Sequence, residues 1–328
     1  MARFSPLFSS SSGNSMYIAA SGSSILIDAG MSAKQLELAL RRIDADPAQL
    51  RAIFVTHEHS DHVKGLRVFA ARHKIDVYAS AGTLQALDEA QVLNGKFYAG
   101  VMPEGGMEAG SLFVRPFPIS HDCREGFGYV VELPGERRVA VATDMGVMTD
   151  AVMQAISGCD LVVLESNHDV RMLENGPYPY PLKRRILSDR GHLSNDACAC
   201  VLEQLVSRGS TRFCLAHLSK ENNNPYLGAL PGTFGERCGS HHMAVFAPEL
   251  HVGAEADVDV AKRCMATVAG TAQECIFAIE PLRQQYTVAI ERQESILALE
   301  ELLEIESIAD TDGGTVVAVA PRDRKSVV

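Results

Sequence analysis

The chain has 328 residues, of which 46% are hydrophobic and 22% charged, the balance of a globular protein with a sizeable core. Its formal net charge of −11 argues against a basic scaffold for nucleic acid, but not against an enzyme whose metal ions supply local positive charge. No stretch approaches the ~18 apolar residues of a membrane span, and residues 3–15 lack the apolar run of a secretory signal. We therefore expect a soluble, cytoplasmic protein with no membrane partner.

The sequence holds eight cysteines, none of them in a C-x-x-C pair. Most lie among apolar residues, as Cys214 does between Phe213 and Leu215. This pattern indicates buried thiols in a reducing compartment and not a disulfide framework.

Apolar strands and amphipathic helices alternate through the first two thirds of the chain. Ser21-Gly22 between the first two apolar runs predicts a hairpin. Ser32, with Gln35 three residues later, is typical of a capping box at a helix start. We expect strands at 16–20, 25–27, 52–55, 76–79, 139–142, 161–164 and 213–216, antiparallel hairpins within 97–133, and helices at 66–71, 151–156 and from Ser194 to about 205.

Side chains of the kind that bind metal ions stand where these strands end. Asp28, His57, Asp144 and His217 each follow an apolar strand closely. In an open α/β sheet, sites gather outside the carboxyl ends of the strands, because helices cover the faces. The alternation predicts the α/β class with a functional site at one edge.

The character of the sequence changes near residue 228. We divide the chain into a first domain at 1–227 and an atypical C-terminal segment at 228–328, to which the sequence assigns no function. Within that segment the pattern predicts an amphipathic helix at 294–308 and a final strand near 315–321.

His57-Glu58-His59-Ser60-Asp61-His62 is the densest group of candidate metal ligands. Residues two apart point the same way from an extended chain, so His57 and His59 can reach one ion. Asp61 and His62 follow the turn and are expected beside a second ion. The alternative is a solvated loop with chance histidines; its position directly after a buried strand favours metal binding.

Three residues farther along the chain, His121, Asp144 and His217, are expected to close the site. A carboxylate such as Asp144 can bridge two cations, and ions ~3.5–4 Å apart can share one hydroxide as nucleophile. Each residue taken singly is equally compatible with a structural role; taken together and in order, they favour ligation.

The pattern H-x-H-x-D-H with a downstream His, Asp and His resembles the metallo-β-lactamase superfamily over roughly residues 1–227. The resemblance implies a four-layer αββα sandwich with a dinuclear site at one edge. The chain is similar to the YycJ/WalJ branch in particular, in the strings at 9–14, 55–65, 120–122, 165–169, 182–195 and 216–223. That branch is regarded as DNA-directed 5′ exonucleases, so the resemblance implies phosphodiester hydrolysis of a nucleic-acid substrate, with DNA as the first expectation.

The family pattern also assigns ligands to each ion. It places His57, His59, His121 and Asp144 on the first ion, and Asp61, His62, Asp144 and His217 on the second. Asp28 matches a family Asp that holds the loop at 57–62, called the histidine loop below, in place through hydrogen bonds. The alternative is that Asp28 is a plain turn residue before Gly30. Ligation by nitrogen and oxygen alone leaves two Zn or two Mn ions as the expected cofactors.

The expected reaction is in-line attack on phosphorus by a hydroxide that bridges the ions. Asp61 would orient the hydroxide or accept its proton. The leaving oxygen needs a proton or a cation, for which His192 and His168 are candidates, as general acid or as phosphate contact. For both histidines, a structural hydrogen bond to a loop carbonyl is the alternative.

Candidate substrate contacts are basic or lie in a loop rich in serine and glycine. A solvated helix face explains the basic cluster at 183–185 equally well, and a plain turn explains the loop. Tyr178 and Tyr180 are candidates to stack on a terminal base, with lid packing as the alternative. The candidate phosphate contacts are Ser11, Gly13, Asn14, Lys183, Arg184, Arg185, Arg190 and Lys220.

Two other functions are compatible with the same ligands. A glyoxalase-II-like thioester or lactone hydrolase would polarise a carbonyl where the nuclease polarises a phosphoryl group, but would leave the basic cluster without a purpose. A metal-binding regulatory module without turnover is the third, and the full set of ligands argues against it.

Overall fold

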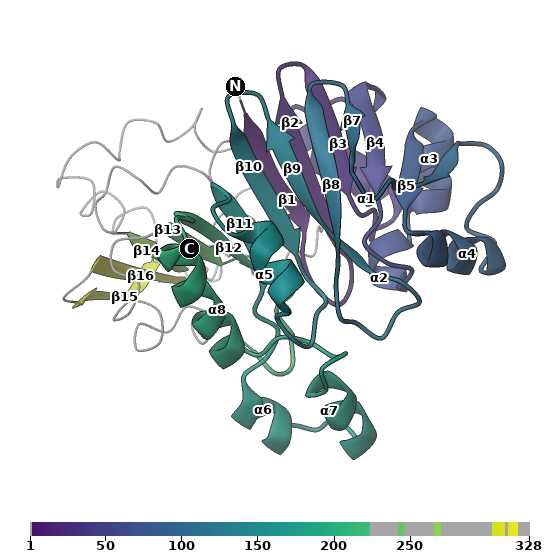
Figure 1. The fold of residues 1–328 in the computed structure, drawn as a ribbon. Coiled ribbons are helices and arrows are strands. Elements are labelled where there is room, and N and C mark those ends of the chain that lie inside the picture. Colours follow the sequence, from purple (N-terminus) through teal and green to yellow (C-terminus); the bar gives the residue numbers. More distant parts are fainter. Residues whose placement is uncertain (1, 224–241, 246–265, 270–303, 312–313, 321–328) are drawn as a thin grey trace, which may run out of the picture.

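The computed structural model describes residues 2–223, 242–245, 266–269, 304–311 and 314–320. Two β-sheets pack face to face, and helices cover their outer faces (Figure 1). The six-stranded sheet has the order β1-β2-β3-β4-β5-β6, and the ten-stranded sheet has the order β15-β16-β14-β13-β12-β11-β10-β9-β8-β7. The predicted four-layer αββα sandwich is confirmed.

The six-stranded sheet is antiparallel from β1 to β3 and parallel from β3 to β6. Its strands are β1 Arg3–Phe8, β2 Ser15–Ala20, β3 Ser23–Ile27, β4 Leu50–Phe54, β5 Asp76–Ala79 and β6 Ala99–Val101. The helices that connect them are α1 Ala33–Arg42, the 3-10 turn η1 Pro47–Gln49, α2 Ser60–Val63, α3 Leu66–His73 and α4 Ala81–Glu89.

The ten-stranded sheet is antiparallel from β7 to β10, parallel from β10 to β13 and antiparallel beyond. Its strands are β7 Met107–Ala109, β8 Leu112–Pro118, β9 Phe127–Leu133, β10 Arg137–Ala142, β11 Leu161–Glu165, β12 Arg212–Ala216, β13 His242–Val245, β14 Ala266–Ala269, β15 Glu304–Thr311 and β16 Gly314–Ala320. The helices are α5 Asp150–Ile156, α6 Val170–Asn175, α7 Tyr180–Ile186 and α8 Asn195–Ser207.

Successive side chains of the central strands enter different cores, because neighbouring residues of a strand point to opposite faces. In β3, Ile25 and Ile27 pack between the sheets, whereas Leu26 packs under the outer helices. In β11, Val163 packs between the sheets and Val162 faces the outer core under α5 and α8. Burial on both faces explains why these strands are continuous apolar runs.

Local signals set the helix starts as expected. Ser32 caps α1 by accepting a hydrogen bond from the Gln35 backbone N–H, and its hydroxyl donates to the Gln35 side chain at 2.5 Å. Ser194 caps α8 in the same way, accepting from Ala197. These caps satisfy backbone donors that a helix leaves unpaired at its first turn.

One element of the C-terminal segment differs from its prediction. Residues 304–311 form strand β15, which pairs with β16, so a helix at 304–308 is wrong; the remainder of that predicted helix lies outside the described residues. The strand expected near 315–321 is present as β16. The pairing partner β16 supplies the backbone hydrogen bonds, and this tertiary contact overrides the helical pattern.

Two further sequence expectations can be compared with the described residues. The cysteines among them, Cys123, Cys159, Cys198, Cys200 and Cys214, are free thiols. None of the helices in this part of the chain is both long and apolar enough to cross a bilayer.

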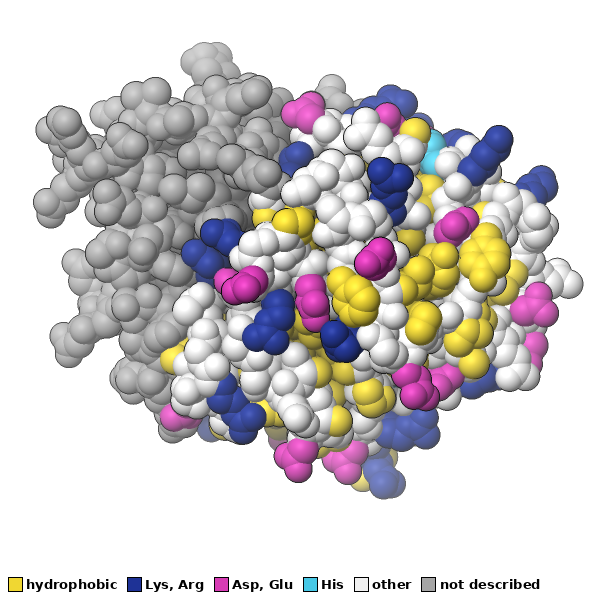
Figure 2. Space-filling model, turned by 45° about the horizontal axis from the view of Figure 1, so that its top comes forward, with side chains coloured by type: hydrophobic (Ala, Val, Ile, Leu, Met, Phe, Trp, Pro, Cys, Tyr) yellow, Lys and Arg dark blue, Asp and Glu magenta, His cyan; other side chains and the backbone are white. Residues whose placement is uncertain are grey.

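The carboxyl ends of the central strands of both sheets meet at one edge of the sandwich. Helices α6 and α7 stand at this edge, at the bottom of Figure 1, and α2 lies higher, at the lower right of the sheets. Figure 2 tilts the opposite end forward and shows Lys and Arg interspersed with Asp and Glu on the described surface. Positive charge is not gathered on that face.

Gly30, just after β3, lies against the backbone of the loop that carries Asp61 and His62. A Cβ at this position would lie 1.7 Å from the Asp61 carbonyl oxygen and 2.5 Å from the Asn14 backbone nitrogen. Both atoms belong to the backbone, so neither can rotate away. The loop that carries Asp61 and His62 can take this position only beside a glycine.

We predict that Gly30→Ala lowers the free energy of unfolding by about 1–3 kcal/mol, because the added methyl overpacks fixed backbone. Urea denaturation followed by circular dichroism measures it. Gly105→Ala is the matched control, since a Cβ there would meet nothing within 4 Å. Equal stability of the two variants would contradict the close approach.

Candidate metal centre

The histidine loop leaves the end of β4 and turns into α2. His57 and His62 are fully buried, whereas His59 lies at the pocket mouth. The ring centroid of His57 is 4.5 Å from that of His59 and 4.1 Å from that of His62. The H-x-H-x-D-H spacing therefore folds its imidazoles into one cluster.

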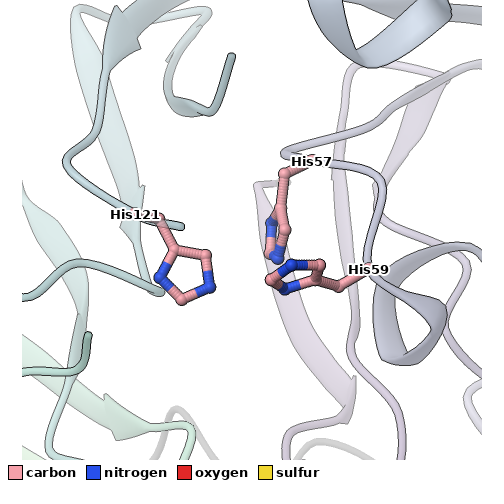
Figure 3. Close-up of side chains that lie close together, drawn as sticks. All are labelled: His57, His59 and His121. Carbon is pink, nitrogen blue, oxygen red and sulfur yellow. The ribbon is translucent and has the colours of Figure 1, made fainter. Parts of the chain in front are cut away.

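The other sheet supplies the facing side of the pocket. His121 follows β8, and its ring centroid lies 4.9 Å from that of His57 and 5.1 Å from that of His59. Figure 3 shows His121 reaching across from one sheet toward His57 and His59 on the other. One ring nitrogen of each residue lies within 4.8 Å of the others, so the three can hold one ion.

Asp144 and His217 complete a second set of ligands. One donor atom each from Asp61, His62 and His217 forms a group within 4.8 Å, and His57, His62 and Asp144 form another. The Asp144 carboxylate lies 3.3 Å from His62 Nε2, 3.8 Å from His121 Nε2 and 3.5 Å from His217 Nδ1. It stands between the two sets, where a bridging carboxylate would have to be.

The tertiary structure thus brings the whole predicted ligand set together: His57, His59, Asp61, His62, His121, Asp144 and His217. The clusters are consistent with a dinuclear metal site. These residues follow strands of both sheets, and each of them lies within at least one of the groups.

Hydrogen bonds at Nδ1 leave Nε2 of several imidazoles aimed at the pocket. His62 Nδ1 lies 2.7 Å from the Asp28 carboxylate, His217 Nδ1 lies 2.8 Å from Glu165, and His121 Nδ1 lies 3.0 Å from the Gly191 carbonyl. When Nδ1 carries the proton that it donates, Nε2 offers the lone pair that a metal needs.

Three buried atoms of the candidate ligands have no hydrogen-bond partner among the described residues: His57 Nε2, Asp144 Oδ2 and His217 Nε2. A buried polar atom left without a partner costs ~1–3 kcal/mol, so native proteins rarely keep one without a reason. Metal coordination satisfies all three. The residues present fit a pair of divalent cations.

Asp28 fixes the histidine loop from the end of β3. Its carboxylate accepts hydrogen bonds from the Thr56 backbone N–H at 2.8 Å, from the Thr56 hydroxyl at 2.9 Å and from His62 Nδ1 at 2.7 Å. Burial raises the pKa of Asp28, while His62 and Thr56 act in the opposite direction. Asp28 is therefore a positioning residue for His62, in the place that the family pattern assigns to it.

Glu165 is a residue whose role the sequence reasoning missed. It ends β11, is completely buried, and accepts from His192 Nδ1 and His217 Nδ1 at 2.8 Å each and from the backbone N–H of Met145 at 2.9 Å. Burial raises its pKa, but His192 and His217 outweigh burial and hold the carboxyl ionised. Its position at the end of an apolar strand was the same signal that singled out Asp144.

Backbone conformation at three of these strand ends is left-handed. The φ angles are 64° at Asp28, 58° at Asp144 and 58° at His217. Non-glycine residues rarely adopt this region, and those that do concentrate at functional sites. The strain turns each side chain out of its strand and into the pocket.

The two candidate acids occupy different environments. His192 lies at the pocket, its ring centroid 5.0 Å from His121 and 5.2 Å from His217, and its side chain remains partly exposed. His168 is 1% exposed and stands outside the ligand groups. Burial lowers the pKa of His168 to about 4, so its ring is neutral near pH 7 and is a poor proton donor. The geometry favours His192.

The candidate phosphate contacts also differ from one another. The Lys183 ammonium donates to the carbonyls of Glu174 and Gly176, at 2.8 Å each, and so ties α7 to the end of α6. Arg185 pairs with Asp122, and Arg190 donates to the His121 carbonyl at 3.0 Å. Arg184 and Lys220 are exposed.

The serine-glycine loop lies against the metal pocket. Asn14 Nδ2 donates to the Ser10 carbonyl at 2.9 Å and lies 3.2 Å from Asp61 Oδ2, and Asn14 is buried. Ser11 is exposed, and Gly13 packs beside Met31. Asn14 thus contacts the candidate ligand Asp61 directly, which the sequence alone could not show.

Residues 23–218 match the family model described as the β-lactamase superfamily domain. The chain belongs to the metallo-β-lactamase superfamily. It is 38% identical over 231 residues to the exodeoxyribonuclease YycJ of Bacillus anthracis, an alignment that covers 69% of this chain and 86% of the relative. It is 36% identical over 225 residues to the exodeoxyribonuclease WalJ of Streptococcus pneumoniae, covering 67% and 83%.

Solved structures of the superfamily share the fold. The metallo-β-lactamase fold protein YhfI from Bacillus subtilis superposes with a TM-score of 0.57 at 14% identity, covering 75% of this chain and 96% of that one. A diphosphatase of the PhnP family superposes with a TM-score of 0.55 at 19% identity, covering 71% and 92%. The predicted class of metal-dependent hydrolase and the resemblance to the YycJ/WalJ proteins are confirmed.

We predict that Glu165→Gln lowers the affinity of this superfamily member for divalent ions about 10–100-fold, because His217 loses the carboxylate that orients it. Titration calorimetry of chelator-treated protein with Mn²⁺ measures it. Glu132→Gln, which removes an exposed partner of Arg115, is the control and should bind as the wild type does. Unchanged affinity in Glu165→Gln would remove its positioning role.

We also predict that His168 makes the fold sensitive to acid. Its folded pKa of about 4 lies below the value of about 6.5 expected in the unfolded chain, so the unfolded state takes up the proton first as pH falls. The contribution to stability is complete above pH 6.5 and is lost toward pH 4, amounting to about 2 kcal/mol between pH 7 and pH 5. Urea denaturation in chelator at both pH values should show a smaller loss for His168→Gln than for the wild type; equal losses would contradict the assignment.

Proposed function

We propose that this protein is a dinuclear metal-dependent phosphodiesterase that digests DNA from its 5′ end, in DNA repair or processing in the cytoplasm. The observation that carries the proposal is the complete ligand set in a chain that covers 86% of the exodeoxyribonuclease YycJ at 38% identity. Its named relatives act on DNA, and the pocket has the donors that such chemistry needs.

His57, His59 and His121 with Asp144 would hold the first ion, and Asp61, His62 and His217 with Asp144 the second. Two divalent cations bound there would offset the charge of a phosphodiester and lower the pKa of a nucleophilic water. Nitrogen and oxygen donors suit Zn and Mn, and no cysteine thiolate belongs to the ligand groups of the described residues.

Asp61 is suited to orient the nucleophile or to receive its proton. Burial raises its pKa, but the imidazoles of His217 and His62 outweigh burial and hold the carboxyl ionised. Its side chain is partly exposed at the pocket mouth, where a substrate can reach it. An ionised carboxylate at the edge of the pocket can act as ligand and as proton acceptor.

His192 is suited to protonate the leaving oxygen. Glu165 accepts a hydrogen bond from its Nδ1 at 2.8 Å, which orients the ring and leaves Nε2 as the atom that can face the leaving oxygen. The side chain of His192 is partly exposed and its ring lies next to those of His121 and His217, within reach of a bound phosphodiester.

Substrate phosphates would approach along α7, next to the pocket. Arg184 and Tyr180 on this helix are exposed, and Tyr180, 72% exposed, offers a ring face to an unpaired base. Arg190, which contacts the His121 carbonyl, and the exposed Lys220 add positive charge, whereas Arg185 is paired with Asp122. Local charge of this kind can recruit a phosphate backbone in a protein of net negative charge.

We predict that chelator-treated protein regains nuclease activity with Mn²⁺ or Zn²⁺ and releases label early from a 5′-labelled duplex, while a 3′-labelled duplex shortens gradually. Asp61→Ala should lose at least about 100-fold in rate, because it removes a ligand and a proton acceptor. Asp150→Ala, an exposed first-turn residue of α5, is the matched control.

Metal content, DNA cleavage and hydrolysis of S-lactoylglutathione should be measured on the same preparations. Turnover of the thioester without DNA cleavage would replace the proposal with a thioester hydrolase. Two bound ions without turnover of either substrate would indicate a regulatory module. Full nuclease activity in Asp61→Ala with both ions bound would contradict the catalytic assignment.

A further inference from the structure

Asp122 follows His121 directly and places its carboxylate at the mouth of the first group of ligands. Its Oδ1 atom lies 3.3 Å from His121 Nε2 and 4.0 Å from His59 Nε2. Its side chain is 28% exposed. Asp122 thus stands between solvent and two candidate ligands of the first ion, and the family pattern assigns it no role.

Asp122 Oδ1 shares one property with three atoms of the candidate ligands. It is buried and has no hydrogen-bond partner among the described residues, as is true of His57 Nε2, Asp144 Oδ2 and His217 Nε2. Its closeness to the imidazoles is therefore not explained by hydrogen bonding to them. A cation bound between these groups would satisfy Oδ1, because Arg185 contacts only the other carboxylate oxygen.

The spacing agrees with shared coordination. Neighbouring ligands of one ion, bonded at ~2.0–2.2 Å in a five- or six-fold shell, lie roughly 3 Å apart. Asp122 Oδ1 lies 3.3 Å from His121 Nε2, which is close to this spacing. The distance of 4.0 Å to His59 Nε2 is longer, but lies within reach of a wider coordination shell such as that of Mn²⁺.

The other carboxylate oxygen is held from α7. Arg185 Nε donates to Asp122 Oδ2, and the guanidinium and carboxylate form an ion pair. This contact leaves Oδ1 turned toward the histidines. The Arg185 contact thus fixes the orientation of the Asp122 carboxylate at the mouth of the first ligand group.

Charge balance also favours a carboxylate at this position. The first group has three imidazole donors, His57, His59 and His121, and shares Asp144 with the second ion. The second group has Asp61 of its own. A carboxylate at Asp122 would give each divalent ion one anionic residue beside the shared one, which lowers the repulsion between two cations in one pocket.

We propose that Asp122 is a further donor to the first ion and that Arg185 is the residue that positions it. This inference rests on the dinuclear site proposed above. It also gives α7 a second role: the helix expected to meet substrate phosphates holds the carboxylate of the first ion site through Arg185.

Titration of the chelator-treated full chain with Mn²⁺, by calorimetry and by electron paramagnetic resonance of free Mn²⁺, tests the proposal without reference to activity. The wild type should bind two ions. Asp122→Asn should weaken one of them about 10-fold or more and leave the other within twofold. Arg185→Met should weaken the same ion to a smaller extent, and Asp122→Glu should recover part of the loss.

Asp189→Asn, an exposed carboxylate on the nearby loop after α7, is the matched control and should bind both ions as the wild type does. Thermal melting of each metal-free variant checks that the fold is intact. Wild-type affinities for both ions in Asp122→Asn, or equal weakening of both ions, would overturn the role of Asp122 alone. A wild type that binds fewer than two ions would overturn the dinuclear site and, with it, this inference.

Discussion

Two buried carboxylates hold the pocket from opposite sheets, and the geometry of the centre depends on them. Asp28 at the end of β3 orients His62, and Glu165 at the end of β11 orients His192 and His217. Burying a carboxylate raises the free energy of the folded state unless its oxygens accept hydrogen bonds or form ion pairs. The donors that surround Asp28 and Glu165 therefore fix the positions of both carboxylates. These hydrogen bonds fix the orientation of imidazole side chains that would otherwise rotate.

The pocket concentrates features that oppose folding. Left-handed backbone at Asp28, Asp144 and His217, together with buried atoms that lack partners, raises the free energy of the metal-free protein. The three cores on and between the sheets supply the compensating burial. Metal binding would recover part of the cost, because ions bind the folded arrangement and not the unfolded chain.

The distribution of charge at the site differs from the net charge of the whole chain. The net charge of −11 describes the whole chain, whereas the site edge has Arg184, Arg185 and Arg190 beside an acidic pocket. Not all of these cations are available to a substrate. Lys183 is tied to the end of α6, and Arg185 to Asp122, so a basic run in the sequence divides into structural and exposed members.

The sequence by itself determined the α/β alternation, most strand positions, and the seven candidate ligands. It could do so because a strand buried on both faces is a continuous apolar run and because H-x-H-x-D-H follows such a strand at once. It misplaced residues 304–308, where pairing with β16 decides the conformation. It also gave Glu165 no role and did not separate His168 from His192.

Only the tertiary structure decided the roles of these residues. Glu165, Asp122 and Asn14 act through partners 27 to 63 positions away in the chain. No local periodicity or motif in the sequence shows which side chains come within about 3 Å of each other when the two sheets pack together. Burial, too, is a property of the whole fold, and burial is what makes His168 neutral and leaves His192 able to reach the pocket.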